Sequence, residues 1–587
     1  MPRDEHADDG ADEGGARGTA AEGTADESDP TRRDVLARTG GSVAAGVAAT
    51  LAGRGLVGTV EAATNRTDRR PEAAAENPEA TFPQSVASGD PTPDGVVLWT
   101  RLAPDRYRDG ESVTATVARD EAFDDVVGTY EVPGGVVGPG TDYTVRLTLD
   151  GELDPGTAYH YRFAYRGVAS RTGRCRTLPA PDASPDSVSF ALCTCQDYRN
   201  GYYGAYGHVA EADVDFLVHL GDFVYESAGP SAYDGRDVEL PSGASQAMDL
   251  EDFRHLHRTY RTDRFLRRAL RRHTLIATWD DHEIVNNRYW DYEADAPGCW
   301  PADHPAANDA ERLRDLFADG IRAWWEYLPA RVRYDEDAPL RERIRLNREF
   351  AFGDLVDLVV TDERLHRSEQ AGTQRARQLS FQSDDESGSS RTILGERQRE
   401  WFLDSLDASE ATWTAWANEV LNMAFSLRED GNRVYNADAW DGYEAERATI
   451  TDALADVANA VALTGDMHTA LAGYVQQSYP DDDEASPSRV GVEFMTPAVT
   501  SVNLGELLEL PDGEFGRRLA SELVAETNPH VEFFDSHHWG YATVTFTPDN
   551  CTYSAWAVDK DSDEMGDRER LATLRVRAGE TEIRDVR

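Results

Sequence analysis

Residues 274–283, TLIATWDDHE, place an apolar, β-branched run directly before two aspartates, a histidine and a glutamate. Three other segments share this design: 188–197 (VSFALCTCQD), 214–226 (VDFLVHLGDFVYE) and 460–468 (AVALTGDMH). In an open α/β sheet, ligands bind beyond the carboxyl ends of the strands. The four segments therefore predict buried strands whose ends meet in a single polar site, although they are spread over most of the chain.

Short apolar runs alternate with helical patterns from Asp186 onward. The expected strands are 188–195, 214–220, 274–279, 355–361, 412–416 and 460–464. The expected helices are 250–272, 309–327 and 395–406. This alternation predicts an α/β domain with buried strands, which we expect over residues 186–560, with 561–587 as a C-terminal tail.

The segment 82–180 has a different, all-β pattern. Its β-branched runs, such as 95–102, 113–117 and 142–149, are separated by Gly, Pro and Asp turns. The turn and alternating strand at 153–163 resemble the late strands of fibronectin-type-III-like sandwiches. We therefore expect an N-terminal fibronectin-III-like β-sandwich, preceded by a linker at 64–81, and assign it no chemistry.

The charge of the chain limits its partners. It has 587 residues with 108 acidic and 59 basic side chains, a formal net charge of −49, and Lys560 as its one lysine. This balance excludes a nucleic-acid binder that relies on a general basic surface and disfavours binding to an anionic membrane surface. Acidic excess with lysine depletion indicates adaptation to very high salt, because salt screens the self-repulsion. The alternative is an ordinary acidic secreted protein.

The N-terminal region indicates export. Residues 1–30 are acidic and nearly free of large apolar groups, which is typical of a disordered tail. Arg32-Arg33 then precedes a Gly/Ala-rich apolar run from Gly40 to about Val60. This pattern resembles a twin-arginine signal peptide over 31–63, with cleavage near Ala63. The alternative is a chance arginine pair before a membrane anchor, but the run is too broken for a good span.

The cysteines do not indicate a disulfide scaffold. There are only five, at 175, 193, 195, 299 and 551, and the odd number leaves at least one thiol unpaired. If the strand extends to residue 195, Cys193 and Cys195 lie on the same face because they are two residues apart. The end of the strand then decides which of the two reaches the polar site.

Each polar cluster is a weak signal alone, since a Gly-Asp pair is usually a turn and a cysteine in a strand is usually part of the core. Together they offer a thiolate, carboxylates, a phenol, amides and imidazoles. Such a mixed set of ligands suits iron or a similar ion beside a harder, oxygen-liganded ion.

The order Cys-Gln, Gly-Asp-X-X-Tyr-Glu, Trp-Asp-Asp-His-Glu and Gly-Asp-X-His resembles the PhoD-like alkaline phosphatases, within the calcineurin-like metallophosphoesterases. The resemblance extends over about residues 82–560. Further matching segments are 85–91, 97–102, 362–364, 438–443, 528–530 and 540–541. It implies that the sandwich precedes a βαβα four-layer metallophosphoesterase sandwich.

The resemblance also implies roles for individual residues. It assigns Cys195, Tyr225 and His468 to a ferric ion and Asp222 to a bridging position. It assigns Asp281, Asn286 and Asp466 to a second ion of the calcium type, which prefers oxygen ligands. Asp280 and Asn418 stay open as direct ligands or as residues that orient ligands.

The implied reaction is hydrolysis of a phosphate ester. Cations neutralise the dianion and lower the pKa of a bound water, so that the resulting hydroxide attacks phosphorus. His282 would protonate the leaving group or hold the phosphate, with a structural hydrogen bond as the alternative. Arg364 would clamp a phosphate oxygen or pair with one of the many acids.

We expect an exported monomer, secreted or at the cell surface, that acts on small phosphate esters and releases phosphate. A phosphodiesterase or phospholipase-D-type activity is the alternative within enzymes. A non-catalytic exported binding protein would be expected to lose ligand positions, and none of the core ligand positions is missing here.

Overall fold

The computed structural model describes residues 60–61, 77–230, 235–300, 304–370, 381–382, 391–429, 432–479, 488–511 and 513–586. The predicted acidic tail and nearly all of the predicted signal peptide lie outside the described residues. Among the helices described in these ranges, none is long and apolar enough to cross a membrane.

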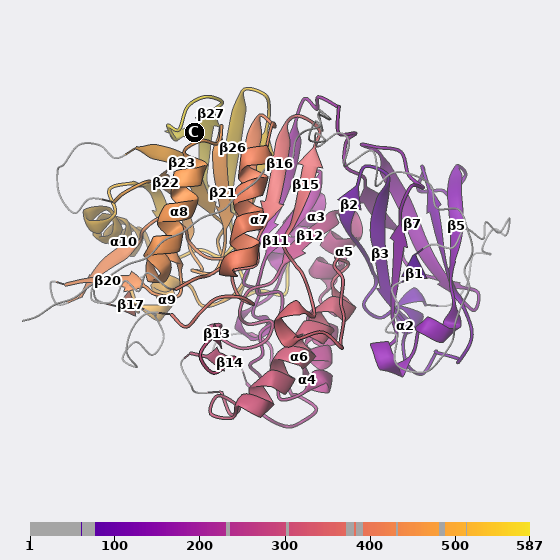
Figure 1. Cartoon of the computed structure of the whole chain (residues 1–587). Coiled ribbons are helices and arrows are strands. Elements are labelled where there is room, and N and C mark those ends of the chain that lie inside the picture. Colours follow the sequence, from indigo (N-terminus) through magenta and orange to yellow (C-terminus); the bar gives the residue numbers. More distant parts are fainter. Residues whose placement is uncertain are drawn as a thin grey trace, which may run out of the picture. The chain divides into compact units, whose positions relative to one another are not determined.

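The α/β region, which follows residue 186 and is called the catalytic region below, consists of four layers in the order helix, sheet, sheet, helix (Figure 1). The helices are α2 (Pro78–Thr81), α3 (Gly204–Glu211), α4 (Leu250–Tyr260), α5 (Arg264–Arg272), α6 (Ala310–Tyr327), α7 (Gly395–Ala408), α8 (Glu444–Leu454), α9 (Leu504–Leu507) and α10 (Gly513–Thr527). Helices α3–α6 cover one sheet, and α7 and α8 cover the other. This arrangement gives the chain the α/β sandwich that the sequence predicts.

The first sheet has eleven strands. Their order is β1 (Val60–Glu61), β6 (Thr144–Leu149), β3 (Gly95–Arg101), β2 (Val86–Thr92), β12 (Thr274–Thr278), β11 (Phe216–Leu220), β10 (Val188–Cys193), β25 (Gly540–Phe546), β26 (Asn550–Val558), β27 (Arg568–Arg577) and β28 (Arg584–Asp585). Strands β10, β11 and β12 are parallel. Their carboxyl ends therefore share one edge of the sheet.

The second sheet has seven strands. Their order is β15 (Arg348–Phe352), β16 (Val356–Val360), β18 (Trp413–Asn418), β21 (Ala460–Thr464), β23 (Arg489–Met495), β22 (Ala470–Gln476) and β24 (Val531–Asp535). Strands β16, β18, β21 and β23 are parallel. Two small sheets flank it: β13 (Arg288–Asp291) with β14 (Ala296–Cys299), and β17 (Phe381–Gln382), β20 (Asn432–Asn436) and β19 (Ser426–Glu429).

Three apolar clusters fill the spaces between the four layers. The middle cluster, between the sheets, is made almost entirely of inward-facing strand residues such as Phe190, Phe352 and Phe546, whose rings meet edge to face. Both faces of the central strands are therefore covered. This explains why they read as continuous apolar runs rather than as alternating ones.

The N-terminal β-sandwich shares a sheet with the catalytic region. Strands β2, β3 and β6 face a separate five-stranded sheet of β5 (Val126–Val132), β4 (Val113–Ala118), β7 (Ala158–Tyr165), β8 (Val168–Ala169) and β9 (Gly173–Arg176). Strand β2 also pairs with β12 through Gly89 and Leu275. A Cβ at Gly89 would lie 2.3 Å from the Pro329 carbonyl oxygen, so this close junction requires glycine.

Three expected segments differ from the structure. Residues 561–587, expected as a C-terminal tail, contain β27 and β28, which extend the first sheet beyond β26. The helix expected at 250–272 is two helices, because Asp263 accepts hydrogen bonds from the backbone N–H groups of Phe265 and Leu266 and so caps a new helix. The strand expected at 188–195 ends at Cys193. Cys195 has φ +52°, so strand alternation does not reach it.

A buried ion-pair network joins the sandwich to the catalytic helices. The Asp142 carboxylate accepts hydrogen bonds from Arg101 (2.8 Å), Arg258 (2.6 Å) and the Tyr327 hydroxyl. Burial raises the pKa of Asp142, but Arg101 and Arg258 outweigh burial, so the pKa is lowered overall. The carboxylate is therefore ionised and holds two arginines from different layers.

We predict that Asp142→Asn destabilises the fold by about 3 kcal/mol, because it leaves the buried Arg101 without its carboxylate partner and leaves Arg258 only the exposed Glu251. The pKa of Asp142 is lowered on folding, so this loss is complete above its ordinary value of 3.8 and shrinks as the pH falls below it. Calorimetry in strong salt measures it. Asp150→Asn, which breaks the exposed pair with Arg331, is the control and should cost about 1 kcal/mol or less. Equal losses in both variants would contradict the role of Asp142.

Candidate metal centre

The polar residues that follow the strands lie in unusual backbone conformations. Cys195, Asp222, Asp466 and His468 all have left-handed φ values, between +52° and +64°. Such conformations cost about 1–3 kcal/mol each for residues other than glycine, and they concentrate at functional sites. Gly221 has φ +99°, and a Cβ there would lie 2.5 Å from the Asp280 Cβ. The turns are therefore shaped to bring these side chains together.

One group of donors combines sulfur, oxygen and nitrogen. Ligand atoms of Cys195, Asp222 and His468 lie within 4.8 Å of one another. The Tyr225 hydroxyl joins them, donating to Asp222 Oδ2 at 2.7 Å and lying 3.3 Å from His468 Nε2. Ser501 Oγ donates to the Tyr225 phenol oxygen at 2.6 Å. This group brings together the four residues expected around the ferric ion.

His468 is oriented for ligation. Its Nδ1 lies 2.6 Å from the Val502 carbonyl oxygen, which only accepts, so Nδ1 carries the proton. This leaves the Nε2 lone pair facing the group, as in many metal-ligating histidines. Burial lowers the pKa of His468 to about 4, so the ring is neutral near pH 7.

The second group consists of carboxylates. Oxygens of Asp280, Asp281 and Asp466 lie within 4.8 Å of one another, and a third group of Asp222, Asp281 and His282 adjoins it. Burial, together with neighbouring carboxylates, raises the pKa values of Asp222 and Asp466 well above their ordinary range. Asp280 Oδ2 is buried without a hydrogen-bond partner. These carboxylates fit divalent or trivalent cations, which remove their mutual repulsion.

Arg364 lies inside the carboxylate group and is fully buried. It forms ion pairs with Asp280, with Asp438 at 2.7 Å and with Asp466 at 2.9 Å. Its Nη2 is also 3.7 Å from Asp281. The structure thus shows the acid-pairing alternative for Arg364, and it places the guanidinium at the edge of the site.

His282 is held by a carboxylate and by an aromatic ring. Its Nδ1 lies 2.7 Å from Glu226 Oε2, and its ring stacks on Tyr225 with centroids 4.2 Å apart. Burial lowers the pKa of His282, but Glu226, Asp281 and Asp222 outweigh it and raise the pKa well above 6.5. The carboxylate at Nδ1 leaves Nε2 as the ring nitrogen available to a substrate.

The side-chain amide nitrogens of the two asparagines considered as ligands donate to backbone carbonyl groups. Asn286 Nδ2 donates to the Trp300 carbonyl oxygen at 3.1 Å. Asn418 donates from Nδ2 to the Val420 carbonyl oxygen and accepts from Trp440 Nε1. In the structure both ends of the Asn418 amide are used, whereas Asn286 keeps its side-chain oxygen for another partner.

Sequence reasoning did not assign Glu226 and Glu283, although both stand inside the quoted motifs. Glu283 is fully buried and accepts hydrogen bonds from the backbone N–H groups of Asp222 (3.1 Å), Phe223 (2.8 Å) and Asp280 (2.8 Å). It therefore fixes two ligand-bearing turns to each other. Its position directly after His282 was the signal that could have identified it.

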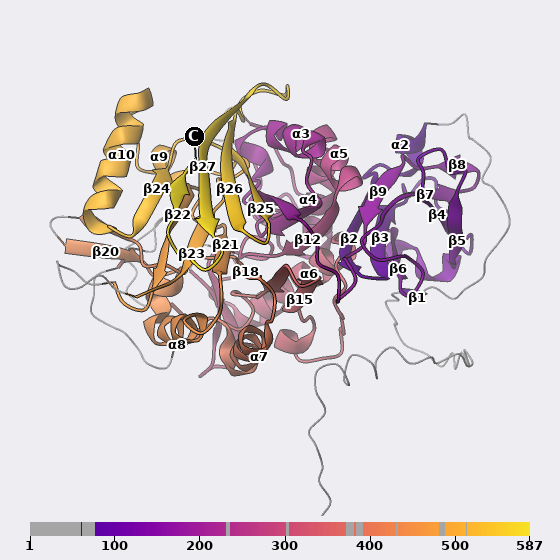
Figure 2. The ribbon, with the colours of Figure 1, turned by 90° about the horizontal axis from the view of Figure 1, so that it is seen from above.

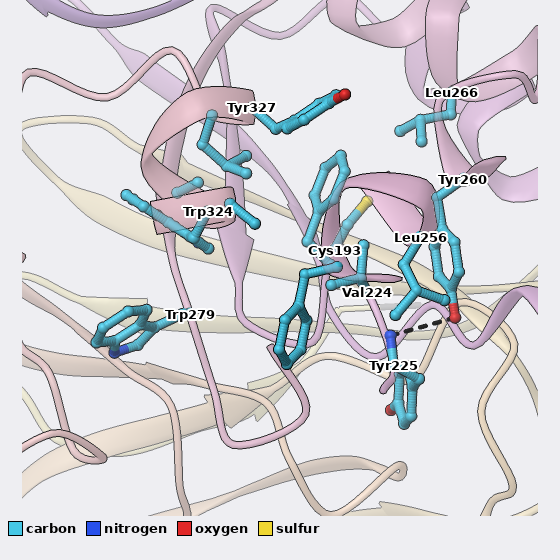
Figure 3. Packing of buried hydrophobic residues seen from close by; sticks show 14 of the residues in the cluster. Cys193, Val224, Tyr225, Leu256, Tyr260, Leu266, Trp279, Trp324 and Tyr327 are labelled. Carbon is cyan, nitrogen blue, oxygen red and sulfur yellow. Dashed lines mark hydrogen bonds between the residues drawn. The ribbon is translucent and has the colours of Figure 1, made fainter. Parts of the chain in front are cut away.

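Aromatic packing supports the other side of the site. The Tyr260 hydroxyl accepts a hydrogen bond from the Tyr225 backbone N–H at 3.2 Å, as Figure 3 shows. Cys193 lies in this core cluster with Val224 and Leu256. Burial raises the pKa of the Cys193 thiol well above its usual range, so it stays protonated. Of the two neighbouring cysteines, Cys195 is the one in the site.

Two mixed sheets between helix layers, with grouped S, O and N donors at the shared strand ends, define a metal-dependent hydrolase of the phosphoesterase class. The chain belongs to the PhoD-like phosphatase family, whose model matches residues 190–555, and the model of that family's N-terminal domain matches residues 67–179.

Similarity to individual proteins supports the same family. The chain is 32% identical over 478 residues to alkaline phosphatase D of Bacillus subtilis (strain 168), covering 80% of this chain and 76% of that protein. A solved structure described as PhoD matches with a TM-score of 0.74 at 29% identity, covering 88% of this chain and 94% of that one. The protein is therefore a phosphoric ester hydrolase with the fold that the sequence predicted.

We predict that Glu283→Gln lowers metal retention by about 10- to 100-fold, as is usual when a residue that orients ligands is lost. The amide NH₂ of glutamine cannot accept the hydrogen bonds that the second carboxylate oxygen accepts. Metal content after dialysis, measured by mass spectrometry, tests this.

The control is Glu446→Gln. Glu446 is also buried and accepts from the N–H groups of Ile393 and Leu394, but it holds no turn that carries a predicted ligand. It should lose stability while keeping its metal. Equal metal loss in both variants would contradict the specific role of Glu283.

Proposed function

We propose that the protein is an exported alkaline phosphomonoesterase with a ferric ion and calcium at the two donor groups. Cys195, Asp222, Tyr225 and His468 would hold iron, and Asp281, Asn286 and Asp466 would face calcium. The observation that carries this proposal is the meeting of a thiol, a phenol, an imidazole and a carboxylate at one point, beside a group of carboxylates. Softer and harder donors separate in this way when two different ions are bound.

When bound, these ions would supply charge neutralisation of the phosphate and a water of lowered pKa. The protein side chains do the rest. His282, with Glu226 at Nδ1, would present Nε2–H to the leaving-group oxygen and protonate the departing alkoxide. Glu226 stabilises the charged ring before transfer and keeps the imidazole oriented.

Arg364 would bind a phosphate oxygen at the edge of the carboxylate group. Its guanidinium is fixed by Asp280 and Asp438, so no side-chain entropy is lost when an oxyanion approaches. Burial lowers the pKa of Arg364, but the neighbouring carboxylates, Asp280 first, outweigh burial and raise the pKa well above its ordinary value. The side chain is therefore permanently charged.

The export route and the high-salt habitat are part of the same proposal. They are supported by the sequence: Arg32-Arg33 before a Gly/Ala-rich run, and a net charge of −49 with a single lysine. Replacing both arginines by lysine should abolish export of a reporter fused after residue 63. Unchanged export would refute the twin-arginine route without affecting the enzyme assignment.

We predict that the native protein in strong salt has a visible phenolate-to-iron absorption band and hydrolyses p-nitrophenyl phosphate faster than bis-p-nitrophenyl phosphate. Tyr225→Phe should bleach the band and lower kcat at least tenfold, because the ring stays but the ligand oxygen is lost. Tyr260→Phe is the matched control and should keep the band, since the Tyr260 hydroxyl contacts the Tyr225 backbone N–H and Asp197, neither of which is a predicted iron ligand atom. A colourless active enzyme, or a band that survives Tyr225→Phe, would contradict the iron assignment.

We also predict that a calcium chelator abolishes hydrolysis while far-ultraviolet circular dichroism in strong salt stays unchanged. The apolar layers hold the secondary structure without the ion, although its loss restores the repulsion among the carboxylates and should lower the thermal stability. Activity should return with added Ca²⁺. Full activity at saturating chelator would overturn the calcium assignment.

A further inference from the structure

An arginine cluster lies where α5 packs against β9, at the junction with the N-terminal sandwich (Figure 2). The nine residues of α5 read RFLRRALRR. Its arginines are Arg264, Arg267, Arg268, Arg271 and Arg272, and the β9 segment adds Arg171, Arg174 and Arg176. So many basic residues in one place are unexpected in a chain with 108 acidic and 59 basic side chains.

Half of these arginines have carboxylate partners. The pairs are Arg171 with Glu79 (3.3 Å), Arg176 with Asp215 (3.5 Å), Arg268 with Glu211 (2.9 Å), and Arg264 with Asp563 (3.4 Å). Arg264 also lies 3.8 Å from Glu564. Among the described residues, the other four arginines form no ion pair.

Arg174, Arg271 and Arg272 have no ion pair and no side-chain hydrogen bond within the described part of the chain. Arg267 donates only to the Pro83 carbonyl oxygen, at 3.1 Å. Arg174 and Arg271 are half-buried, and Arg271 Nε is a buried donor without an acceptor. These four residues form the unpaired arginine cluster.

The unpaired arginines repel one another. Burial lowers the pKa of Arg174, and the charges of Arg272 and Arg176 lower it further. Burial likewise lowers the pKa of Arg271, with the charges of Arg171 and Arg267 adding to it. Like charges gathered on an otherwise acidic protein destabilise it unless an anion is bound there.

The cluster is separate from the metal centre. Helix α5 ends at Arg272, directly before β12 begins at Thr274, whereas the metal-site residues follow the other end of β12. At about 3.3 Å per residue, the two ends of β12, Thr274 and Thr278, are roughly 13 Å apart, and Asp281 lies beyond Thr278. An anion at the cluster therefore does not occupy the catalytic site.

We propose that the unpaired arginine cluster binds a linear anion that carries several phosphate groups. Guanidinium groups bind phosphate oxygens through paired, planar hydrogen bonds. Cations supplied by two elements, β9 and α5, fit more than one phosphate at a time. Strong salt screens single charges beyond about 3 Å, so only several simultaneous direct contacts hold an anion there.

The proposal does not depend on the identity of the metals. Inorganic oligophosphate and a phosphodiester backbone share this chemistry, and the experiment distinguishes them. The proposal is consistent with the exclusion of a nucleic-acid binder that relies on a general basic surface, because the cluster is local and the chain as a whole is acidic. The site would hold a phosphate-rich molecule on the same protein whose metal centre hydrolyses phosphate esters.

The test is fluorescence anisotropy with the full-length metal-loaded protein in stabilising salt. The probe is a labelled phosphorothioate oligonucleotide, which resists hydrolysis. Inorganic oligophosphate, orthophosphate and polyglutamate of equal charge serve as competitors. The variant R174Q/R271Q/R272Q is compared with R106Q/R333Q/R518Q, which removes three arginines that have carboxylate neighbours elsewhere.

The cluster variant should raise Kd at least tenfold, and the control variant should stay within twofold of the native protein. The slope of log Kd against log salt should decrease by about two, because each of the three lost phosphate contacts contributes about 0.7. An unlabelled phosphodiester oligonucleotide is a further competitor: displacement of the probe by a lower concentration of oligophosphate than of this oligonucleotide would assign the site to oligophosphate, and the reverse order would assign it to a phosphodiester backbone. Hydrolysis of p-nitrophenyl phosphate should be unchanged, because these arginines are outside the metal centre.

Equal Kd values for the cluster and control variants would overturn the proposal. Competition by polyglutamate as strong as that by oligophosphate would also overturn it, because phosphate recognition would then be absent. If the triple variant does not fold, the exposed single change Arg272→Glu replaces it. That variant should weaken binding at least threefold, and unchanged binding would again refute the proposal.

Discussion

Mutual repulsion among buried carboxylates is the constraint on which the rest of this structure depends. Asp222, Asp280 and Asp281 are buried and Asp466 is partly buried; their oxygens form two adjoining groups that share Asp281, and Arg364 pairs with Asp280 and Asp466. Burying charges without compensation is costly. The left-handed turns add strain at Asp222 and Asp466. A fold that keeps such an arrangement does so for the cations that bind there, and its layers serve to hold the carboxylates in place.

Two sheets share this task. Strands of the first sheet deliver Cys195, Asp222 and Asp281, and strands of the second deliver Asp466 and His468. Neither sheet alone has a complete set of donors. Buried glutamates then fix the turns: Glu283 joins two turns of the first sheet, and Glu493 performs the same task for the loop after β18. Misplacement of either sheet would separate the donors, so the apolar cluster between the sheets is also a condition for catalysis.

Local patterns predicted the α/β domain and the polar residues at the strand ends, whereas the family resemblance implied the four layers and the ligand roles. Apolar strands that end in Asp or His place their polar residues at one sheet edge whatever the loops between them do. The sequence could not predict the pairing of β2 with β12, because a sheet shared between two regions depends on the close approach at Gly89. It missed the new helix capped by Asp263, since helical periodicity continues through 250–272. It also missed Glu226 and Glu283, because a carboxylate that accepts hydrogen bonds from backbone N–H groups has no characteristic spacing in a sequence.

Acidic residues thus enter twice: in the proposed adaptation of the surface to salt, and in a carboxylate group that fits metal ions. The most direct test of the second is a crystal structure of the native protein with anomalous data on both sides of the iron absorption edge. The account predicts an iron peak bonded to Cys195 Sγ and the Tyr225 phenol oxygen, and a second, iron-free cation beside Asp281 and Asp466. A single metal, or iron located among Asp280, Asp281 and Asp466, would contradict it.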